Sequence, residues 1–567
     1  MWSTRKQDQS LQYRERSHPC GTRDRRFFLD QHWRWILPWA AVVLIMVALL
    51  LNGCGAVGPN FQKPAAPVAK EWIEQDDPRV KTEAADYSQW WTAFNDPVLN
   101  SLIELAYKQN PTLQVAGLHI LETRAQLGIA VGNLFPQQQQ ATAAYNYNRS
   151  SQNAPNTAGG GDLNYQTYTY GFNAAWELDL WGKYRRGVES ADANLIASIA
   201  SYDDALVTLT GDVASAYVQI RIYEERLQVA RENVELQKRS LDLTETRYKY
   251  GAVTELDVQQ ARALLYDTQS QIPALEVGWR QAQNALSILL GMPPRDLQEM
   301  LGGPKSIPST PAEVVVGIPA ELLLRRPDVR NAELQAAAQC AQIGVAKADL
   351  FPKISLTGSF GFSSSDSRVT KTGGSNFADL FGWKSFTMAM GPSIEWPILN
   401  YGRITNNVRV QDARFQQLLV TYQNTVLVAA QEVENALVAF LQAQDQVAFL
   451  EQSVKAAKRA VDLSFIQYRE GATDYTRVIT AQQTQLQEQD RLTQARGAIP
   501  TNLISLFKAL GGGWQIRLGK DFVSEETMKT MRSRTNWGNL LPSIDLPKDL
   551  EPPLPASDRE ALRRPDW

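Results

Sequence analysis

Tyr248-Lys249-Tyr250-Gly251 and Tyr468-Arg469-Glu470-Gly471 are two matching phrases, 220 residues apart, on which the fold depends. An apolar residue stands at every seventh position before each phrase. These positions are Leu241, Val234, Leu227, Ile220 and Val213 in the first copy, and Val461, Val454, Val447, Phe440 and Val433 in the second. A seven-residue apolar repeat keeps one helix seam against a partner and imposes a left-handed supercoil.

The length of these segments predicts long antiparallel helical hairpins. A continuous helix from Lys183 to Tyr250 would reach on the order of 100 Å, at about 1.5 Å per residue. A helix of that length buries its seam only against another long helix. Since the apolar spacing resumes after each glycine, we expect the hairpins to turn at Gly251 and Gly471.

A tandem duplication organises the chain. Residues 128–136 return 216 residues later as residues 344–352, and from Gly171 onward the offset is 220. The stretch from Pro136 to Gly171 is four residues shorter than its counterpart from Pro352 to Gly391, which accounts for the difference. Each half therefore reads as helix, strand, loop, strand, long helix, turn and helix.

Each half contains a pair of alternating segments that flank a loop rich in Ser, Asn and Gly, at residues 149–164 and 363–376. Apolar and polar residues alternate along them, which predicts half-buried strands. The apolar positions of the second half include Ile354, Leu356, Phe360 and Phe362. The segments have about ten residues or more, as membrane-spanning strands do. The alternative is a pair of amphipathic hairpins packed on a soluble core.

If the apolar face of these strands meets lipid, the sheet cannot expose an edge, because each unpaired backbone group in hydrocarbon costs several kcal/mol. Four strands from one chain are too few to close a barrel. Several chains must then share one barrel, and three chains would supply about twelve strands, within the known range. The sequence therefore predicts an oligomer.

The N-terminal region contains seventeen uncharged residues, Trp35 to Leu51, after a basic leader. One interpretation is a signal anchor that stays in the membrane, because this length is close to the lower limit for a span. The segment also resembles a bacterial lipoprotein signal, since it ends in Leu51-Asn52-Gly53-Cys54. That resemblance implies that residues 1–53 are a signal peptide and that Cys54 is lipidated (palmitate). With Gly55 next, it also implies transfer to the outer membrane.

Composition excludes most catalytic chemistry. The net charge is -3, and basic residues gather in residues 1–34, so the rest of the chain is acidic and poorly suited to nucleic acid. Beyond residue 53, the His and Cys complement is His119, Cys54 and Cys340. No zinc site or Ser-His-Asp triad can be built without His119. We expect His119 at the surface or in packing, Cys340 buried, no enzyme activity, no metal and no cofactor.

The chain resembles the outer membrane factors of Gram-negative tripartite efflux pumps (TolC-like and OprM-like channels). It is most similar to the lipoprotein branch that works with resistance-nodulation-division transporters. Several phrases carry the resemblance jointly: Trp91 to Pro97, Trp176 to Lys183, Leu324 to Val329, the two Tyr-x-x-Gly turns and Gly511 to Trp514. Together they cover roughly residues 54–514.

This resemblance implies a mostly α-helical, trimeric channel-tunnel with a transmembrane β-barrel in the outer membrane and coiled-coil hairpins across the periplasm. It implies a homotrimer that contacts outer membrane lipid, a periplasmic membrane fusion adaptor and an inner-membrane resistance-nodulation-division transporter. The function implied is a passive duct for exported drugs and toxic compounds. The alternatives are the duct of a type I protein secretion system and a periplasmic coiled-coil scaffold lipoprotein, which needs no aromatic strands.

The repeats suggest a division of the chain into six parts. Residues 1–53 are the signal peptide and 54–98 a lipid tether and equatorial lead-in. Residues 99–291 and 319–511 are the two repeats, joined by an equatorial linker at 292–318. Residues 512–567 form a C-terminal equatorial segment and a tail that we expect to be irregular, because it has no periodic pattern.

The hairpin tips carry the candidate functional residues. The resemblance implies that Tyr248, Gly251, Tyr468 and Gly471 meet the adaptor, and that the tips open by untwisting the inner hairpin. The family commonly places acidic residues six and nine positions after the second turn glycine.

In this chain those two positions hold Arg477 and Thr480, whereas Asp257 keeps the six-residue position after Gly251. We take Asp257, Arg477 and Thr480 as candidate gate or lumen residues. For Asp257 we favour the alternative interpretation, a solvated charge at a helix start, where the helix dipole stabilises it.

Overall fold

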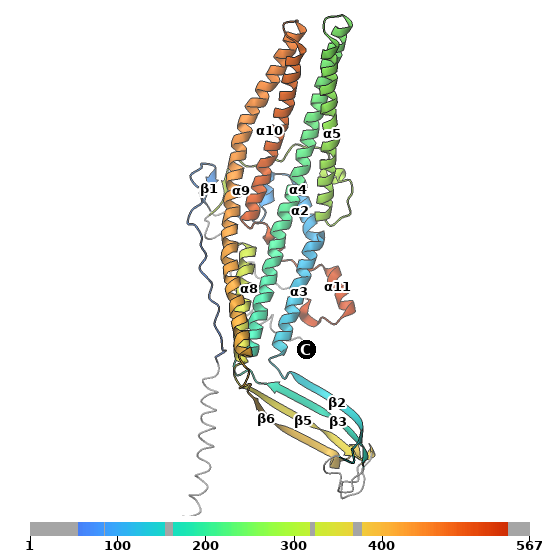
Figure 1. The fold of residues 1–567 in the computed structure, drawn as a ribbon, viewed down its shortest axis with the longest axis vertical. Helices are drawn as coiled ribbons and strands as arrows, with labels where there is room; N and C mark the ends of the chain where they lie inside the picture. Colours follow the sequence, from blue (N-terminus) through green and yellow to red (C-terminus); the bar gives the residue numbers. More distant parts are fainter. Residues whose placement is uncertain (1–54, 84–85, 154–162, 318–323, 367–376, 542–567) are drawn as a thin grey trace, which may run out of the picture. The chain divides into compact units, whose positions relative to one another are not determined.

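The computed structural model describes residues 55–83, 86–153, 163–317, 324–366 and 377–541. Ala56–Trp567 form one compact unit, to which all the elements below belong. The proposed signal peptide and Cys54 lie outside the described residues. Figure 1 shows the helices and strands of the two repeats.

The first repeat begins with helices α2 (Pro97–Gln109) and α3 (Pro111–Gly132), followed by strands β2 (Gln138–Arg149) and β3 (Asn164–Glu177). Helices α4 (Lys183–Lys249) and α5 (Glu255–Leu289) complete it. Each short helix starts at a proline behind a capping side chain, since Asp96 accepts from the Val98 N–H and Asn110 accepts from the Leu113 N–H. Proline fits the first helical position, and the caps satisfy otherwise unpaired donors.

The second repeat has the same order: α8 (Pro327–Ala348), β5 (Lys353–Ser365), β6 (Phe386–Glu395), α9 (Arg403–Arg469) and α10 (Tyr475–Ala509). The corresponding long helices are equal in length, at 67 residues for α4 and α9 and 35 for α5 and α10. The tandem duplication is thus confirmed in three dimensions.

The long helices form the two predicted antiparallel hairpins, with α4 packed on α5 and α9 packed on α10 (Figure 1). Each hairpin turns at a glycine with a left-handed backbone, where φ is 71° at Gly251 and 78° at Gly471. This conformation favours glycine, because a β-carbon would clash with the backbone. Helix α4 also packs on α8 and α10, so the two hairpins adhere along their length.

The four long strands make one antiparallel sheet in the order β2-β3-β5-β6. The central pairing, β3 with β5, joins the two repeats. Strands β2 and β6 are the edges of this sheet. Within the described part of the chain, β2 pairs only with β3 and β6 only with β5, so each has one unpaired edge.

The main core lies where α2, α3, α4, α9 and α10 meet, around residues such as Leu99, Tyr217 and Phe440. The 3-10 helix η1 (Trp90–Phe94) closes it, and the Trp90 ring stacks on Phe507 at 5.4 Å between centroids.

Five short elements, β1, β4, α6, η2 and η3, were not predicted. The two-residue strands β1 (Val80–Lys81) and β4 (Val314–Val315) pair in parallel and tie the lead-in to the linker. The linker contains α6 (Gln298–Leu301), and the segment between β5 and β6 contains the 3-10 helices η2 (Phe377–Phe381) and η3 (Trp383–Ser385).

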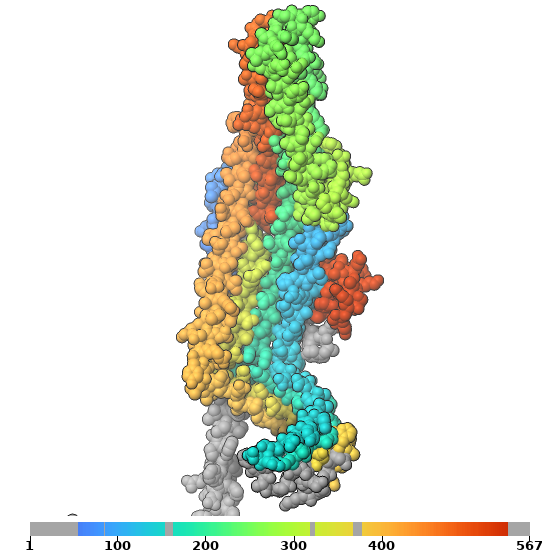
Figure 2. All heavy atoms as spheres, turned by 45° about the vertical axis from the view of Figure 1, so that its right-hand side comes forward, coloured from blue at the N-terminus to red at the C-terminus, as the bar shows by residue number. Residues whose placement is uncertain are grey.

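The expectation of an irregular C-terminal tail is wrong for the part that the structure describes. This part contains η4 (Trp514–Arg517), α11 (Glu525–Arg534) and η5 (Gly538–Leu540). Ser524 caps α11 by accepting from the Thr527 N–H. In Figure 2 this red segment lies against the blue helix α3, where the Arg124 Nη1 donates to the Leu540 carbonyl at 2.8 Å. Only Met531 of α11 is buried, so the sequence of this helix has no apolar periodicity from which it could have been predicted.

Candidate functional site

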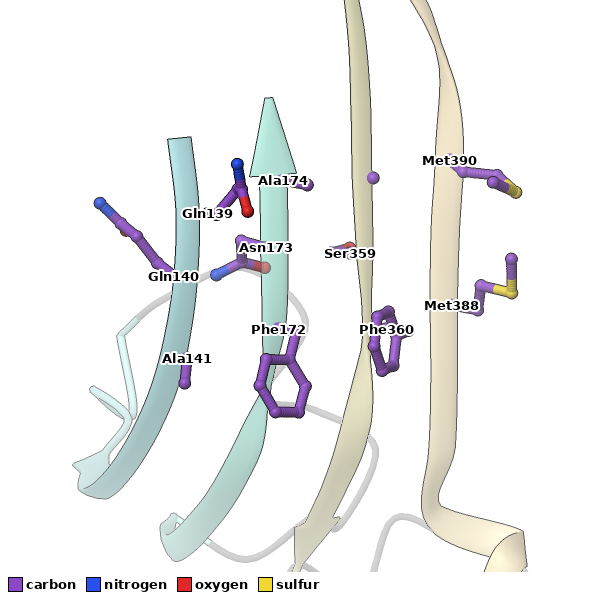
Figure 3. A pocket seen from close by; sticks show the side chains of 11 residues that line it. Gln139, Gln140, Ala141, Phe172, Asn173, Ala174, Ser359, Phe360, Met388 and Met390 are labelled. Carbon is purple, nitrogen blue, oxygen red and sulfur yellow. The ribbon is translucent and has the colours of Figure 1, made fainter. Parts of the chain in front are cut away.

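The four-stranded sheet has one apolar and one polar face. In its register Phe172 lies opposite Phe360, which in turn lies opposite Met388. The neighbouring row, one residue along each strand, holds Asn173 and Ser359. Since successive side chains of a strand point to opposite faces, these rows belong to different faces, and Figure 3 shows both sets of side chains. The predicted alternation is confirmed.

Within the described residues, much of the apolar face is left exposed. Phe172 is 53% exposed, Phe360 54% and Met390 73%, and a shallow hollow of about 520 Å³ runs across these residues. An apolar sheet face of this size left in water would be a strong liability. The alternative of hairpins packed on a soluble core is therefore wrong, because the face that would join such a core is open.

Aromatic residues mark both ends of this sheet. Where the strands meet the helices, the indole N–H of Trp176 donates to the Leu134 carbonyl at 3.1 Å and that of Trp396 donates to the Leu350 carbonyl at 3.1 Å. At the loop end, the rings of Tyr145 and Tyr168 lie 5.3 Å apart. Two aromatic girdles around an apolar band are typical of strands that cross an outer membrane.

A second candidate site lies at the hairpin tips, where one arginine joins the two hairpins. Arg247, at the end of α4, donates from Nη1 to the carbonyls of Tyr468 at 2.5 Å and Arg469 at 3.1 Å. Its guanidinium also lies 4.7 Å from the Tyr468 ring centroid. The cation thus satisfies terminal carbonyls of α9, where the helix dipole favours positive charge.

Two buried tyrosines complete this contact. The rings of Tyr468 and Tyr475 lie 5.0 Å apart, and the Tyr475 hydroxyl lies 2.8 Å from the Ser240 hydroxyl of α4. Burial raises the pKa of both phenols above the usual 10.0, so they remain protonated at neutral pH. We call Arg247, Ser240, Tyr468 and Tyr475 the tip latch.

The two predicted tip tyrosines differ in their surroundings. Tyr248 is 44% exposed, whereas Tyr468 is only 2% exposed. Gly251 and Gly471 are both exposed at their turns. Tyr248 and the two glycines are thus open to a partner, while the Tyr468 side chain serves the tip latch.

Asp257 and Arg477 lie in the first turns of α5 and α10, and Thr480 lies in the second turn of α10. The Asp257 carboxylate accepts from the Thr254 N–H at 2.9 Å and from its hydroxyl at 2.9 Å, which makes a capping box. Arg477 donates its backbone N–H to the Asp474 carboxylate that caps α10. The Thr480 hydroxyl donates to the Thr476 carbonyl. In the single chain, each of these bonds is local to its own helix or helix cap.

Sequence reasoning missed Arg247, Ser240 and Tyr475. Tyr475 stands three residues before Val478 of the apolar repeat that resumes after the turn, and so lies on the same helix face, which could have indicated it. Arg247 precedes the repeated tyrosine by one residue, where the other copy has Gln467, and this difference was the available signal.

Farther from the tips, the α4–α10 seam contains buried amides. Asn233 donates to the Gln489 side chain at 2.8 Å. Gln237 is 2% exposed and Gln482 1%, and neither amide has a hydrogen-bond partner among the described residues. A seam with unpaired amides holds together less firmly than an apolar one, because a buried unsatisfied polar group costs about 1–3 kcal/mol.

The remaining predicted positions are structural. Cys340 is buried at 1% exposure, and burial raises the pKa of its thiol. His119 lies at the surface, 3.1 Å from the Glu122 carboxylate. The chain after Cys54 is bound to the fold from Val57 onward, since the Val57 N–H donates to the Trp181 carbonyl at 3.0 Å.

An open sheet with an apolar outer face and aromatic ends, joined to helical hairpins whose helices have 67 and 35 residues, defines an outer membrane channel that continues into the periplasm. The sequence model of the family described as "Outer membrane efflux protein" matches residues 102–292 and 318–512. The chain belongs to this family, and the two matched segments repeat the duplication.

Individual relatives agree with this assignment. The chain is 33% identical over 479 residues to "Pyoverdine export outer membrane protein OpmQ" of Pseudomonas aeruginosa, covering 83% of this chain and 96% of the relative. It is 30% identical over 473 residues to "Cation efflux system protein CusC" of Escherichia coli, covering 83% and 98%. The solved channel OprN has a TM-score of 0.74 at 32% identity, covering 81% of this chain and 99% of that chain.

The chain is therefore the outer membrane channel of an efflux system, and the predicted fold class, function and location are confirmed. The family consists of channels rather than enzymes, and its members work with an adaptor and an inner-membrane transporter.

Proposed function

We propose that three copies of this chain close one barrel and one helical tunnel, which together form a passive duct for small molecules. The observation that carries the proposal is the four-stranded sheet with two unpaired edges and an exposed apolar face. Lipid cannot satisfy the backbone groups of these edges, so each edge must pair with a neighbouring chain. Three chains give about twelve strands, which is a known barrel size.

The tip latch is the closure of this duct. It joins the end of α4 to the turn of the second hairpin through Arg247 and Tyr475. While it holds, the second hairpin cannot move away from the first at the tips. Helices α4 and α10 separate more readily farther along, because the seam at Gln237 and Gln482 is polar and incompletely bonded.

A membrane fusion adaptor would release the latch from outside, by binding the exposed residues Tyr248, Gly251 and Gly471. An inner-membrane resistance-nodulation-division transporter supplies the driving force in this assembly, since the duct has no energy source of its own. Asp257, Arg477 and Thr480 remain candidate lumen residues, because their exposed or half-exposed side chains lie just beyond the turns.

The cargo is a class of small exported compounds. OpmQ is named for pyoverdine export and CusC for cation efflux, although this chain is similar to both. Relatives of one architecture thus serve different cargoes, which is expected of a passive duct whose substrate is chosen by the transporter. Lipid on Cys54 would add a second membrane attachment to that of the barrel.

One pair of neighbouring substitutions tests the barrel. Met390 lies on the apolar face and Ala389 on the polar face. Met390→Arg would place a charge in lipid, at a cost of about 2–4 kcal/mol per chain near the middle of the membrane. We expect it to reduce the yield of heat-resistant trimers on gels. Ala389→Arg should preserve the trimer and alter its conductance in planar bilayers.

The two variants also define the contrary result. If both leave assembly and conductance unchanged, the sheet does not line a channel. If native mass spectrometry of the wild-type protein in detergent finds a monomer, the shared barrel is wrong.

A further inference from the structure

Residues 377–385, which directly precede β6, fold over the apolar face of the sheet. Three ring pairs define the position. Phe377 lies 5.3 Å from Tyr168, Phe381 lies 5.7 Å from Tyr170, and Trp383 lies 6.4 Å from Phe362. Tyr168, Tyr170 and Phe362 occupy the same face as Phe172 and Phe360, because they are one or two pairs away in the alternation.

This covering segment has an inner and an outer side. Leu380 points to the inside and is only 4% exposed. In contrast, Phe377 is 55% exposed, Phe381 64% and Trp383 78%. We call these three residues the aromatic triad. The rings contact the sheet on one side and leave most of their surface open on the other.

Backbone bonds fix the geometry of the segment. The Gly382 N–H donates to the Asp379 carbonyl at 3.0 Å, and the Ser385 N–H donates to the Gly382 carbonyl at 2.9 Å. The Ser385 hydroxyl donates to the Asp379 carbonyl at 2.7 Å. The Trp383 ring stacks on Phe386, the first residue of β6, at 4.8 Å. The outward position of the triad is therefore built into the fold.

We propose that residues 377–386 are an anchor in the outer leaflet of the outer membrane, with the aromatic triad immersed at the boundary between acyl chains and head groups. The inference rests on the proposed barrel. In a closed barrel the apolar face points outward, so the triad continues the lipid-facing surface of Phe172, Phe360 and Met388 toward the loop end. Trp and Tyr concentrate at this depth, because their rings are apolar with a polar atom at one end.

Lipid is favoured over a second copy of the chain as the occupant. Neighbouring chains in a shared barrel pair through the free backbone edges of β2 and β6. The triad instead lies on the face of the sheet, with Phe377 and Phe381 against β3 and Trp383 against Phe362 of β5 and Phe386 of β6. The exposed Lys384 next to Trp383 fits the same position, since a lysine at this level reaches anionic head groups.

Spin labels on single cysteines would test the anchor in the full chain, reconstituted in vesicles of phosphatidylethanolamine and phosphatidylglycerol. The sites are Phe381→Cys and Trp383→Cys, compared with Phe360→Cys on the apolar face and Ser359→Cys on the polar face. The native Cys340 is buried and should not react. Collisions are measured with oxygen, which dissolves in lipid, and with a water-soluble nickel chelate.

We expect the ratio of oxygen to nickel accessibility at residues 381 and 383 to lie clearly above that at 359 and at or below that at 360. The polar chelate is excluded from apolar lipid, and less strongly so at the boundary with the head groups. A ratio like that of 359, with 360 still lipid-like, would overturn the anchor and leave the barrel intact. Low accessibility to both reagents would mean that protein covers the triad, which also overturns it. If 360 itself is open to nickel, the barrel proposal fails first.

Discussion

Replacing Arg247 with alanine should release the hairpin tips from each other. The arginine makes two charged hydrogen bonds to carbonyls, at 2.5 and 3.1 Å, and lies 4.7 Å from the Tyr468 ring. A hydrogen bond to a charged group contributes about 1.5–3 kcal/mol. Arg247 is partly exposed, so in the variant water replaces part of the lost hydrogen bonding. We therefore take about 2 kcal/mol as the free energy that the whole Arg247 contact contributes to the closed tips.

That loss corresponds to a shift of about 30-fold per protomer toward separated tips. The assay is single-channel recording of the purified protein in planar bilayers, with the fraction of time spent in the high-conductance state as the readout. Arg247→Lys should give an intermediate shift, because an ammonium cannot reproduce the fork of a guanidinium.

The matched control is Arg231→Ala in the same helix. Arg231 pairs with Glu276 at 3.2 Å, within the first hairpin, and both side chains are more than half exposed. Such surface pairs contribute little, so the control should leave the open fraction almost unchanged. If Arg247→Ala and Arg231→Ala behave alike while both remain trimeric, the tip latch does not hold the duct closed.

Three further predictions concern a helix cap, a buried ion pair and a buried carboxyl group elsewhere in the chain. Asp257→Ala should change conductance only modestly and destabilise the start of α5 by about 1 kcal/mol, because the carboxylate is a cap; an open-locked channel would contradict this. Arg517→Ala should lower the free energy of unfolding by about 3–5 kcal/mol, because the substitution leaves the Asp203 carboxylate buried without its ion-pair partner. Proteolysis of the C-terminal segment should become faster. Unchanged thermal unfolding of the variant would refute this prediction. Burial, with the nearby Asp328, raises the pKa of Asp204 from 3.8 to about 6. Its ionisation therefore costs stability as pH rises between these values, and Asp204→Asn should remove this part of the pH dependence of thermal unfolding.

Much of the fold follows from local patterns in the sequence. The heptads ending at Tyr248 and Tyr468 predicted the hairpins, and the glycines predicted the turns. The alternation around Phe360 predicted the strands, because period and side-chain direction are local properties. The two-residue strands and α11 could not be found in this way, since so few of their residues are buried that no period develops.

The tip latch could be predicted only in part. Tyr248 and Tyr468 occupy equivalent positions in the sequence repeat, but in the structure Tyr248 is exposed and Tyr468 is buried. Their difference comes from packing between the hairpins, which places Arg247 of the first copy on the tip of the second. Contacts between distant segments are not encoded in any periodicity, and the β3–β5 pairing escaped prediction for the same reason.

The open edges of the sheet also have a genetic consequence. If three chains must complete each barrel, one defective subunit inactivates a trimer that also contains two normal subunits. A cell that makes normal and assembly-competent but blocked chains in equal amounts would retain only about one intact channel in eight. Alleles with a blocked lumen should thus be dominant over the normal gene, whereas alleles that prevent edge pairing should be recessive.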